Sequence, residues 1–181
     1  MHKQCKRLGV EFTSDEIVKL EGEKTPFTLT CADGKQYKAA SVIIATGAKA
    51  RWLGLAEEEK FKGRGLSACA TCDGFFMRGK NVCIVGGGNT AFEDALFLAQ
   101  FGPQVNLIHR RDAFRADQVT VEKAKNTPNI KLVLNSVPVK ILGSDAVEGV
   151  RVKNVQTGEE SDIACSGLFV AVGAGPQTGF F

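Results

Sequence analysis

Two cysteines separated by two residues are the part of this chain best suited to chemistry. Cys69 and Cys72 enclose Ala70 and Thr71, and Asp73 follows directly. A thiolate is a good nucleophile towards a disulfide, and two cysteines at this spacing can close a ring on oxidation and open it on reduction. Asp73 is a carboxylate suited to proton transfer, although a helix N-cap is the competing interpretation. The segment therefore predicts a redox-active dithiol.

Two other roles for the cysteine pair stay open on the sequence. A structural zinc ion needs four ligands, and one such pair supplies only two. The two histidines, His2 and His109, lie far away along the chain, so we expect no metal and assign no metal ligands. An inert buried pair is the remaining alternative.

A glycine-rich run follows the dithiol and is typical of dinucleotide binding. It comes after an apolar segment at 81–85 and before apolar residues at helical spacing over 91–101. In this context the backbone N–H groups of the turn can approach a pyrophosphate at the helix N-terminus. A plain strand-to-helix turn would not need three adjacent glycines, which are costly to order. The residues concerned are Gly86, Gly87, Gly88, Asn89, Thr90 and Ala91.

A basic segment follows the second predicted strand of this unit. At this position, roughly 20 residues beyond the glycines, an NAD site places an acidic residue on the ribose 2′-hydroxyl. This chain instead has His109, Arg110 and Arg111, with Arg115 further on. Guanidinium groups pair with a phosphate in bidentate geometry, so the pattern favours NADPH, although a solvated basic turn is the alternative. With the dithiol, the motifs indicate NADPH-driven reduction of disulfides.

Composition excludes several other classes of protein. The net charge is only +3 over 181 residues and the basic residues are scattered, so no nucleic-acid partner is expected. No apolar run is long enough to cross a bilayer and no signal peptide is recognisable, so no membrane partner is expected. The other four cysteines are far apart, unlike the framework of a small secreted domain, which fits a reducing, cytoplasmic compartment.

The remaining pattern predicts a β-rich segment followed by alternating strands and helices. The apolar run 41–45 predicts a strand buried on both faces, which ends at Thr46 and Gly47. The earlier strands are expected at 17–20, 27–30 and 36–38, with a hairpin signal at Asp33 and Gly34. Later strands are expected at 81–85, 105–108, 130–134, 147–155, 160–164 and 168–172, and helices at 91–101 and 119–125.

From about Leu8 onwards the chain resembles the bacterial-type, low-molecular-weight thioredoxin reductase family. Its motifs are highly specific in this order. They are ATGA at 45–48, FKGRG at 61–65, SACATCDG at 67–74, GGGNTA at 86–91 and HRRDAFRA at 109–116.

The resemblance implies an NADPH-dependent thioredoxin-disulfide reductase. Electrons would pass from NADPH through FAD to the Cys69–Cys72 disulfide and then to thioredoxin, the protein partner. Cys69 would attack thioredoxin, Cys72 would exchange electrons with the flavin, and Asp73 would donate and accept the proton. The full-length family is homodimeric. The cofactor-binding residues implied are Gly86, Gly87, Gly88, Asn89, Thr90, Ala91, Glu93, His109, Arg110, Arg111 and Arg115 for NADPH, with Thr46 and Gly47 for the flavin.

The resemblance also implies an α/β fold, with a Rossmann-like NADPH-binding domain of the two-dinucleotide-binding flavoprotein type and a β-rich remnant of the FAD domain. We expect part of the FAD domain at 1–52, the NADPH domain at 53–172 and the start of the return segment at 173–181. The chain departs from the family because no FAD-type glycine motif precedes these segments and no Gly-Asp flavin motif follows. Ala174 also stands where the family commonly has histidine. We therefore expect a fragment that does not retain FAD and is inactive alone.

Two alternatives to the reductase stay open. The flavoprotein subunit of alkyl hydroperoxide reductase shares the Cys-Ala-Thr-Cys-Asp segment but normally favours NADH, so the arginines argue against it. A stand-alone NADPH-binding module without flavin is the non-enzymatic alternative.

Overall fold

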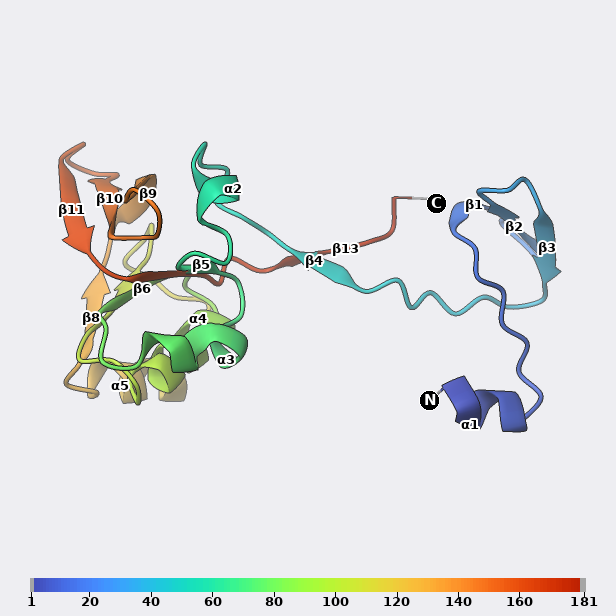
Figure 1. Cartoon of the computed structure of the whole chain (residues 1–181), viewed down its shortest axis with the longest axis horizontal. Helices are drawn as coiled ribbons and strands as arrows, with labels where there is room; N and C mark the ends of the chain where they lie inside the picture. The colour runs from blue at the N-terminus through green and yellow to red at the C-terminus, as the bar shows by residue number, and fades with distance from the viewer. Residues whose placement is uncertain (1, 180–181) are drawn as a thin grey trace. The chain divides into compact units, whose positions relative to one another are not determined.

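A computed structural model describes residues 2–179, which divide into two compact units (Figure 1). The first unit is discontinuous: it contains the residues up to Ala48 and those from Pro176 onwards. The second unit is Lys49–Gly175. The expected boundaries at 52–53 and 172–173 lie inside the second unit, near its ends. No helix among the described residues is long and apolar enough to cross a membrane.

The first unit contains an antiparallel sheet with the strand order β1-β2-β3. At the turn between β2 and β3, Gly34 has a φ of 87°, which favours glycine, and Lys35 N donates to the Asp33 carboxylate at 2.9 Å. These three strands confirm the hairpin pattern of the sequence. The elements are α1 (His2–Arg7), β1 (Ile17–Glu21), β2 (Phe27–Cys31) and β3 (Gln36–Ala39).

The predicted buried strand at 41–45 is wrong for this structure. These residues form no strand, and Ile43 is 93% exposed. A strand buried on both faces needs hydrogen-bonded neighbours at its edges and a covering layer on each side. Within residues 2–179 no strand pairs with this segment, so its apolar side chains stay in contact with water.

The second unit is built on a parallel sheet with the order β5-β12-β6-β7-β8. The residues of β6, β7 and β12 are buried throughout, as expected for strands covered on both faces. One helix connects β6 to β7 and another connects β7 to β8. The strands are β5 (Leu66–Ser67), β6 (Val82–Val85), β7 (Val105–Ile108), β8 (Ile130–Val133) and β12 (Gly167–Val170).

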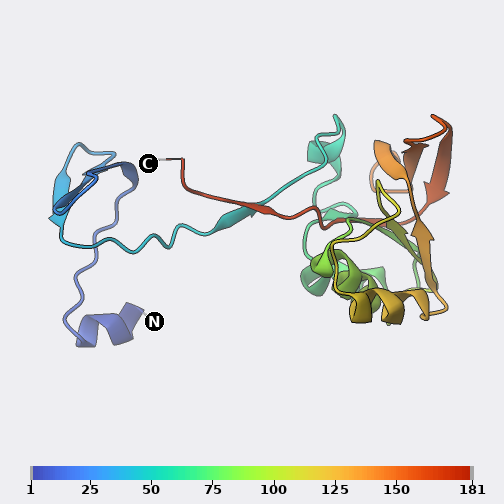
Figure 2. The same ribbon diagram turned by 180° about the vertical axis from the view of Figure 1, so that it is seen from behind.

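Helices cover one face of this sheet (Figure 2). Ile84, Leu107 and Phe169 point to this side and pack with Phe92 and Leu98 of α4. Because side chains alternate along a strand, every second residue of β6, β7 and β12 joins this cluster. The helical elements are α3 (Ala70–Asp73), η1 (Gly74–Met77), α4 (Asn89–Leu98) and α5 (Gln118–Lys125).

An antiparallel sheet of order β11-β10-β9 covers the other face. Cys83, Val85 and Leu168 point to this side and pack with Ile141 and Val150. The unit therefore has three layers, which confirms the predicted α/β class with a parallel sheet. The remaining elements are β9 (Ser136–Leu142), β10 (Gly149–Asn154), β11 (Glu160–Ala164), α2 (Glu58–Phe61), and the paired β4 (Ala48–Ala50) and β13 (Ala174–Pro176).

Candidate functional site

The carboxyl ends of β6, β7 and β12 open into a cavity of about 740 Å³. This is the edge at which open parallel sheets usually bind ligands. The cavity brings together most of the predicted dinucleotide residues with several that the sequence did not indicate. Its walls come from residues 51–53, 85–88, 108–111, 136–138 and 171–173, together with Thr90, Ala113 and Arg115.

Two glycines of the run differ in what surrounds them. A Cβ on Gly86 would lie 2.5 Å from the carbonyl oxygen of Ala171 and 2.6 Å from the Cβ of Ala91, so this glycine permits close packing of β6, β12 and α4. A Cβ on Gly88 would meet nothing within 4 Å. Gly88 is the N-cap of α4 and its cap has no side-chain hydrogen bond. The helix N-terminus is therefore free to receive an anion.

The arginines lie on the loop that follows β7. Arg110, Arg111 and Arg115 are all exposed and all line the cavity. Within residues 2–179 none of the three guanidinium groups forms an ion pair. Three unpaired guanidinium groups beside an open helix N-terminus form a donor set suited to a phosphate-rich ligand.

Three other predicted residues of the glycine run and helix do not line the cavity. The Asn89 side chain accepts a hydrogen bond from Asp117 N at 2.8 Å, which ties α4 to the start of α5. Ala91 is fully buried against the sheet. Glu93 is exposed on α4, and its assignment to the dinucleotide stays a prediction.

The cysteine pair forms a disulfide between Cys69 and Cys72. Cys69 is the N-cap of α3, and its Sγ accepts a hydrogen bond from Cys72 N at 3.2 Å. The Ser67 hydroxyl accepts from Cys69 N at 3.0 Å and so fixes the approach to the helix. Asp73 is itself the N-cap residue of η1, the position that the sequence left open for it. Asp73 stands at the last position of α3, half-buried, and makes no cap hydrogen bond.

An exposed aromatic surface follows the dithiol directly. Phe75 and Phe76 are 62% and 68% exposed, and Cys72 is exposed while Cys69 is half-buried. The guanidinium of Arg78 lies 5.2 Å from the centre of the Phe75 ring. Two neighbouring exposed phenylalanines are unusual on a monomer surface and are typical of a surface that contacts another protein.

The predicted flavin contacts lie in the first unit. The Thr46 hydroxyl donates to the carbonyl oxygen of Gln177 at 2.5 Å, and Gln177 N donates to the carbonyl oxygen of Gly47 at 3.0 Å. Both residues are exposed. Their backbones are thus held by the returning chain, and their contact with a flavin stays a prediction.

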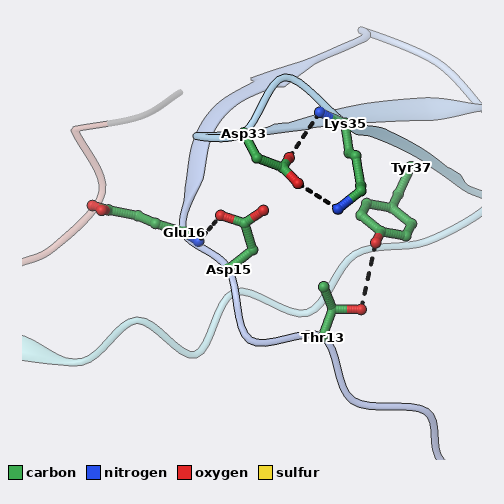
Figure 3. A network of polar contacts seen from close by, with 6 residues as sticks. All are labelled: Thr13, Asp15, Glu16, Asp33, Lys35 and Tyr37. Carbon is green, nitrogen blue, oxygen red and sulfur yellow. Dashed lines mark hydrogen bonds and ion pairs between the residues drawn. The ribbon is translucent and has the colours of Figure 1, made fainter.

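Three residues of the first unit have ligand atoms close enough to hold a cation, and Figure 3 shows two of them, Asp15 and Asp33. The ligand atoms of Asp15, Cys31 and Asp33 lie within 4.8 Å of one another. Lys35 already pairs with Asp33 at 2.5 Å. Burial, with the two neighbouring carboxylates, raises the pKa of the Cys31 thiol, so it stays protonated at neutral pH. We assign no metal site to this cluster.

Sequence reasoning missed a buried carboxylate that supports the cavity wall. Glu58 is only 6% exposed, and its two oxygens accept hydrogen bonds from Leu53 N at 2.6 Å and Gly54 N at 3.2 Å. Leu53 and Trp52 line the cavity. In the sequence Glu58 lies inside an acidic run that resembles a solvated connection, so no local signal distinguishes it from Glu57 and Glu59.

Replacing Glu58 by Ala should destabilise the second unit. Two backbone amides lose a charged acceptor, which typically costs about 2–4 kcal/mol in total. Chemical denaturation followed by circular dichroism measures this loss. Glu59→Ala is the matched control, because Glu59 makes only an exposed ion pair with Lys62 and should change stability little. Equal unfolding midpoints for Glu58→Ala and Glu59→Ala would contradict the assignment.

Comparison of the chain with known proteins agrees with this geometry. A family model for pyridine nucleotide-disulphide oxidoreductases matches residues 2–181. The chain is 44% identical to a thioredoxin reductase of Rickettsia conorii, covering 100% of this chain and 59% of that protein. It is 39% identical to a bifunctional thioredoxin reductase/thioredoxin of Mycobacterium leprae, covering 98% of this chain and 39% of that protein.

Among solved structures, Lactococcus lactis thioredoxin reductase superposes with a TM-score of 0.85 at 37% identity. The match covers 97% of this chain and 58% of that one. The chain thus spans about three-fifths of the length of the thioredoxin reductases it matches. With its matched residues, its parallel sheet and its dithiol, the chain belongs to the pyridine nucleotide-disulphide oxidoreductase family.

Proposed function

We propose that this chain carries the NADPH-binding and dithiol part of a thioredoxin-disulfide reductase. The observation that carries the proposal is the pairing, within one unit, of a disulfide and a cavity whose open glycine turn faces unpaired arginines. The relatives reported above are named thioredoxin reductases, which supports the same activity. The fusion of a reductase with thioredoxin in the Mycobacterium leprae relative supports thioredoxin as the protein partner.

The residues of the cavity fit NADPH. The open helix N-terminus at Gly88 suits the pyrophosphate, because its backbone donors have no side-chain acceptor. Arg110, Arg111 and Arg115 suit the 2′-phosphate, because their guanidinium groups are unpaired among the described residues and can bind it in bidentate geometry. When bound, the nicotinamide supplies two electrons as a hydride.

The dithiol would reduce its partner by two exchange steps. The Cys69 thiolate attacks one sulfur of the partner disulfide, forms a mixed disulfide and releases the other partner sulfur as a thiolate. The Cys72 thiolate then attacks Cys69 Sγ, which forms the Cys69–Cys72 disulfide and releases the second partner thiolate. Two electrons move to the partner, and its two thiolates take up protons. We propose that Asp73 serves in these proton transfers.

The geometry supports Cys69 as the attacking thiol. Its Sγ accepts the hydrogen bond from Cys72 N at the start of α3, and an amide donor at this position helps a sulfur carry negative charge. The exposed rings of Phe75 and Phe76 would give a partner protein an apolar surface next to the sulfurs. The other four cysteines are free thiols, three of them buried, which supports a reducing compartment such as the cytoplasm.

The described residues do not form a complete flavin site. Within residues 2–179 a glycine-rich run connects a parallel strand to a helix only at 86–88, and we assign that turn to NADPH. Thr46 and Gly47 are two exposed contacts without a pyrophosphate turn beside them. We therefore derive no flavin step from this chain, and we propose that the chain alone does not retain FAD. For the same reason a stand-alone NADPH-binding module is the second candidate function.

Arg110→Ala combined with Arg111→Ala should weaken NADPH binding roughly 10- to 100-fold and leave NADH almost unchanged, because only NADPH carries the phosphate. Calorimetric titration of both dinucleotides measures this. Arg64→Ala is the control, since Arg64 is exposed and lies outside the cavity. Equal losses for NADPH and NADH would rule out the assignment of the arginines.

Gly88→Ala should weaken dinucleotide binding while costing less stability than Gly86→Ala. A Cβ at position 88 projects into the open space at the helix N-terminus, whereas a Cβ at position 86 overlaps the Ala171 carbonyl oxygen. Thermal unfolding and NADPH titration of both variants measure the two effects. The interpretation fails if Gly88→Ala binds NADPH as the unaltered chain does.

Cys69 and Cys72 should react with a thiol label only after mild reduction, and Cys69 should be the nucleophile. The probe is a single-cysteine thioredoxin activated as its mixed disulfide with thionitrobenzoate. The reduced Cys72→Ser chain should release thionitrobenzoate and form a covalent adduct at least about tenfold faster than the Cys69→Ser chain, because only Cys69 Sγ has the amide donor. The reverse order of rates would assign the attack to Cys72.

A further inference from the structure

The middle glycine of the run is required by one side chain. A Cβ on Gly87 would lie 2.2 Å from Cε1, 2.3 Å from Nδ1 and 2.6 Å from Nε2 of His109. Gly87 does not have a positive φ, so its backbone conformation is open to any residue. The imidazole ring therefore lies directly against the glycine backbone and excludes a side chain there.

His109 is itself held from several sides. Its backbone N donates to the carbonyl oxygen of Val133 at 2.9 Å, and its own carbonyl oxygen accepts from Ser136 N at 2.9 Å. Its ring nitrogen Nε2 lies 3.1 Å from the carbonyl oxygen of Ala113. The carbonyl can only accept, so Nε2 carries the proton, and in the neutral ring Nδ1 then has none to donate.

Residues 110–115, the arginine loop, contact the glycine turn on both sides of the His109 ring. Arg115 N donates to the carbonyl oxygen of Gly87 at 2.8 Å. The Phe114 ring lies 5.5 Å from the His109 ring and 4.8 Å from the Phe92 ring of α4, measured between ring centres. The imidazole therefore fills the space between the glycine turn and residues 110–115, and it bonds to that loop at Ala113.

We propose that His109 is a positioning residue that fixes the arginine loop against the glycine turn, so that the preference for NADPH over NADH depends on the imidazole although His109 does not bind the phosphate. The proposal rests on the NADPH function proposed above and extends it. The guanidinium groups sit on exposed side chains, so their convergence on one phosphate depends on how firmly the loop backbone is held.

The test is a double-mutant cycle measured by titration of the chain with NADPH and NADH. His109→Ala should weaken NADPH binding roughly 3- to 100-fold, the range of coupling within one network, and change NADH binding much less. In the Arg110→Ala, Arg111→Ala background only Arg115 remains of the three arginines, so the same substitution should weaken NADPH binding much less than in the unaltered chain. His109→Gln keeps a donor that reaches the Ala113 carbonyl, so it should recover most of the affinity.

Three outcomes would overturn the proposal. A full additional penalty from His109→Ala in the Arg110→Ala, Arg111→Ala background would make His109 a direct phosphate ligand. An equal loss of NADH would make its role general to the fold. An unchanged NADPH affinity in His109→Ala would remove its role altogether. If the unaltered chain itself shows no preference for NADPH, the proposed function fails first and this inference fails with it.

A second cycle tests the contact between Gly87 and the ring without any ligand. Gly87→Ala should lower the thermal midpoint in the unaltered chain, because the new methyl overlaps the imidazole. In the His109→Ala background the same methyl should lower the thermal midpoint only slightly. An equal loss of thermal midpoint in both backgrounds would show that something other than the ring requires glycine at position 87.

Discussion

The close approach of the backbone at the end of β6 to its neighbours is the constraint on which the rest of the second unit depends. At Gly86 the chain passes so near the carbonyl oxygen of Ala171 and the side chain of Ala91 that no Cβ fits. This contact fixes where β12 ends and where α4 begins. One residue later the His109 ring occupies the Cβ position of Gly87. The turn thus sets the relative positions of three carboxyl strand ends, and the cavity lies where they meet.

Burial on both faces of the parallel sheet fixes the positions of these strand ends. Alternate residues of β6, β7 and β12 enter the helix-side cluster and the cluster beneath β9–β11. A shift of one residue in any of these strands would exchange two sets of side chains that fit different layers. The sheet is therefore a stiff base, and the loops at its carboxyl edge can hold exposed charges without an internal partner.

Local sequence signals predicted the strands β6, β7, β8 and β12 of this sheet, because a run of apolar residues within one segment marks a buried strand. They did not predict the two-residue strand β5. The segments at 81–85 and 105–108 are apolar except for one asparagine each, and they predict strands without reference to the rest of the chain. The strand β9 was missed because Pro138 interrupts its pattern. The structure accommodates Pro138 because β9 is an edge strand whose register shifts beside Val152. The run 41–45 failed in the opposite way: its apolar pattern predicts a strand, but no strand among the described residues pairs with it.

Side-chain roles were less predictable than elements because they depend on contacts between distant segments. The basic motif at 109–116 predicted the arginines at the dinucleotide site, because their charge and their spacing from the glycines are enough for that prediction. It could not show that Glu58 holds the backbone at Leu53 and Gly54, or that the His109 ring lies directly against Gly87. Both facts depend on which loops fold back on one another, and a single sequence contains no record of that.

The position of the dithiol limits how electrons can reach it. α3 and η1 pack against the carboxyl end of α4, where a Cβ on Gly74 would touch Leu98 at 3.0 Å. The glycine turn stands at the other end of this helix, and a helix of ten residues is about 15 Å long. No residue of the segment 69–76 lines the cavity. Because hydride transfer needs reacting atoms within about 3.5 Å of each other, a dinucleotide confined to this cavity cannot reduce the disulfide directly.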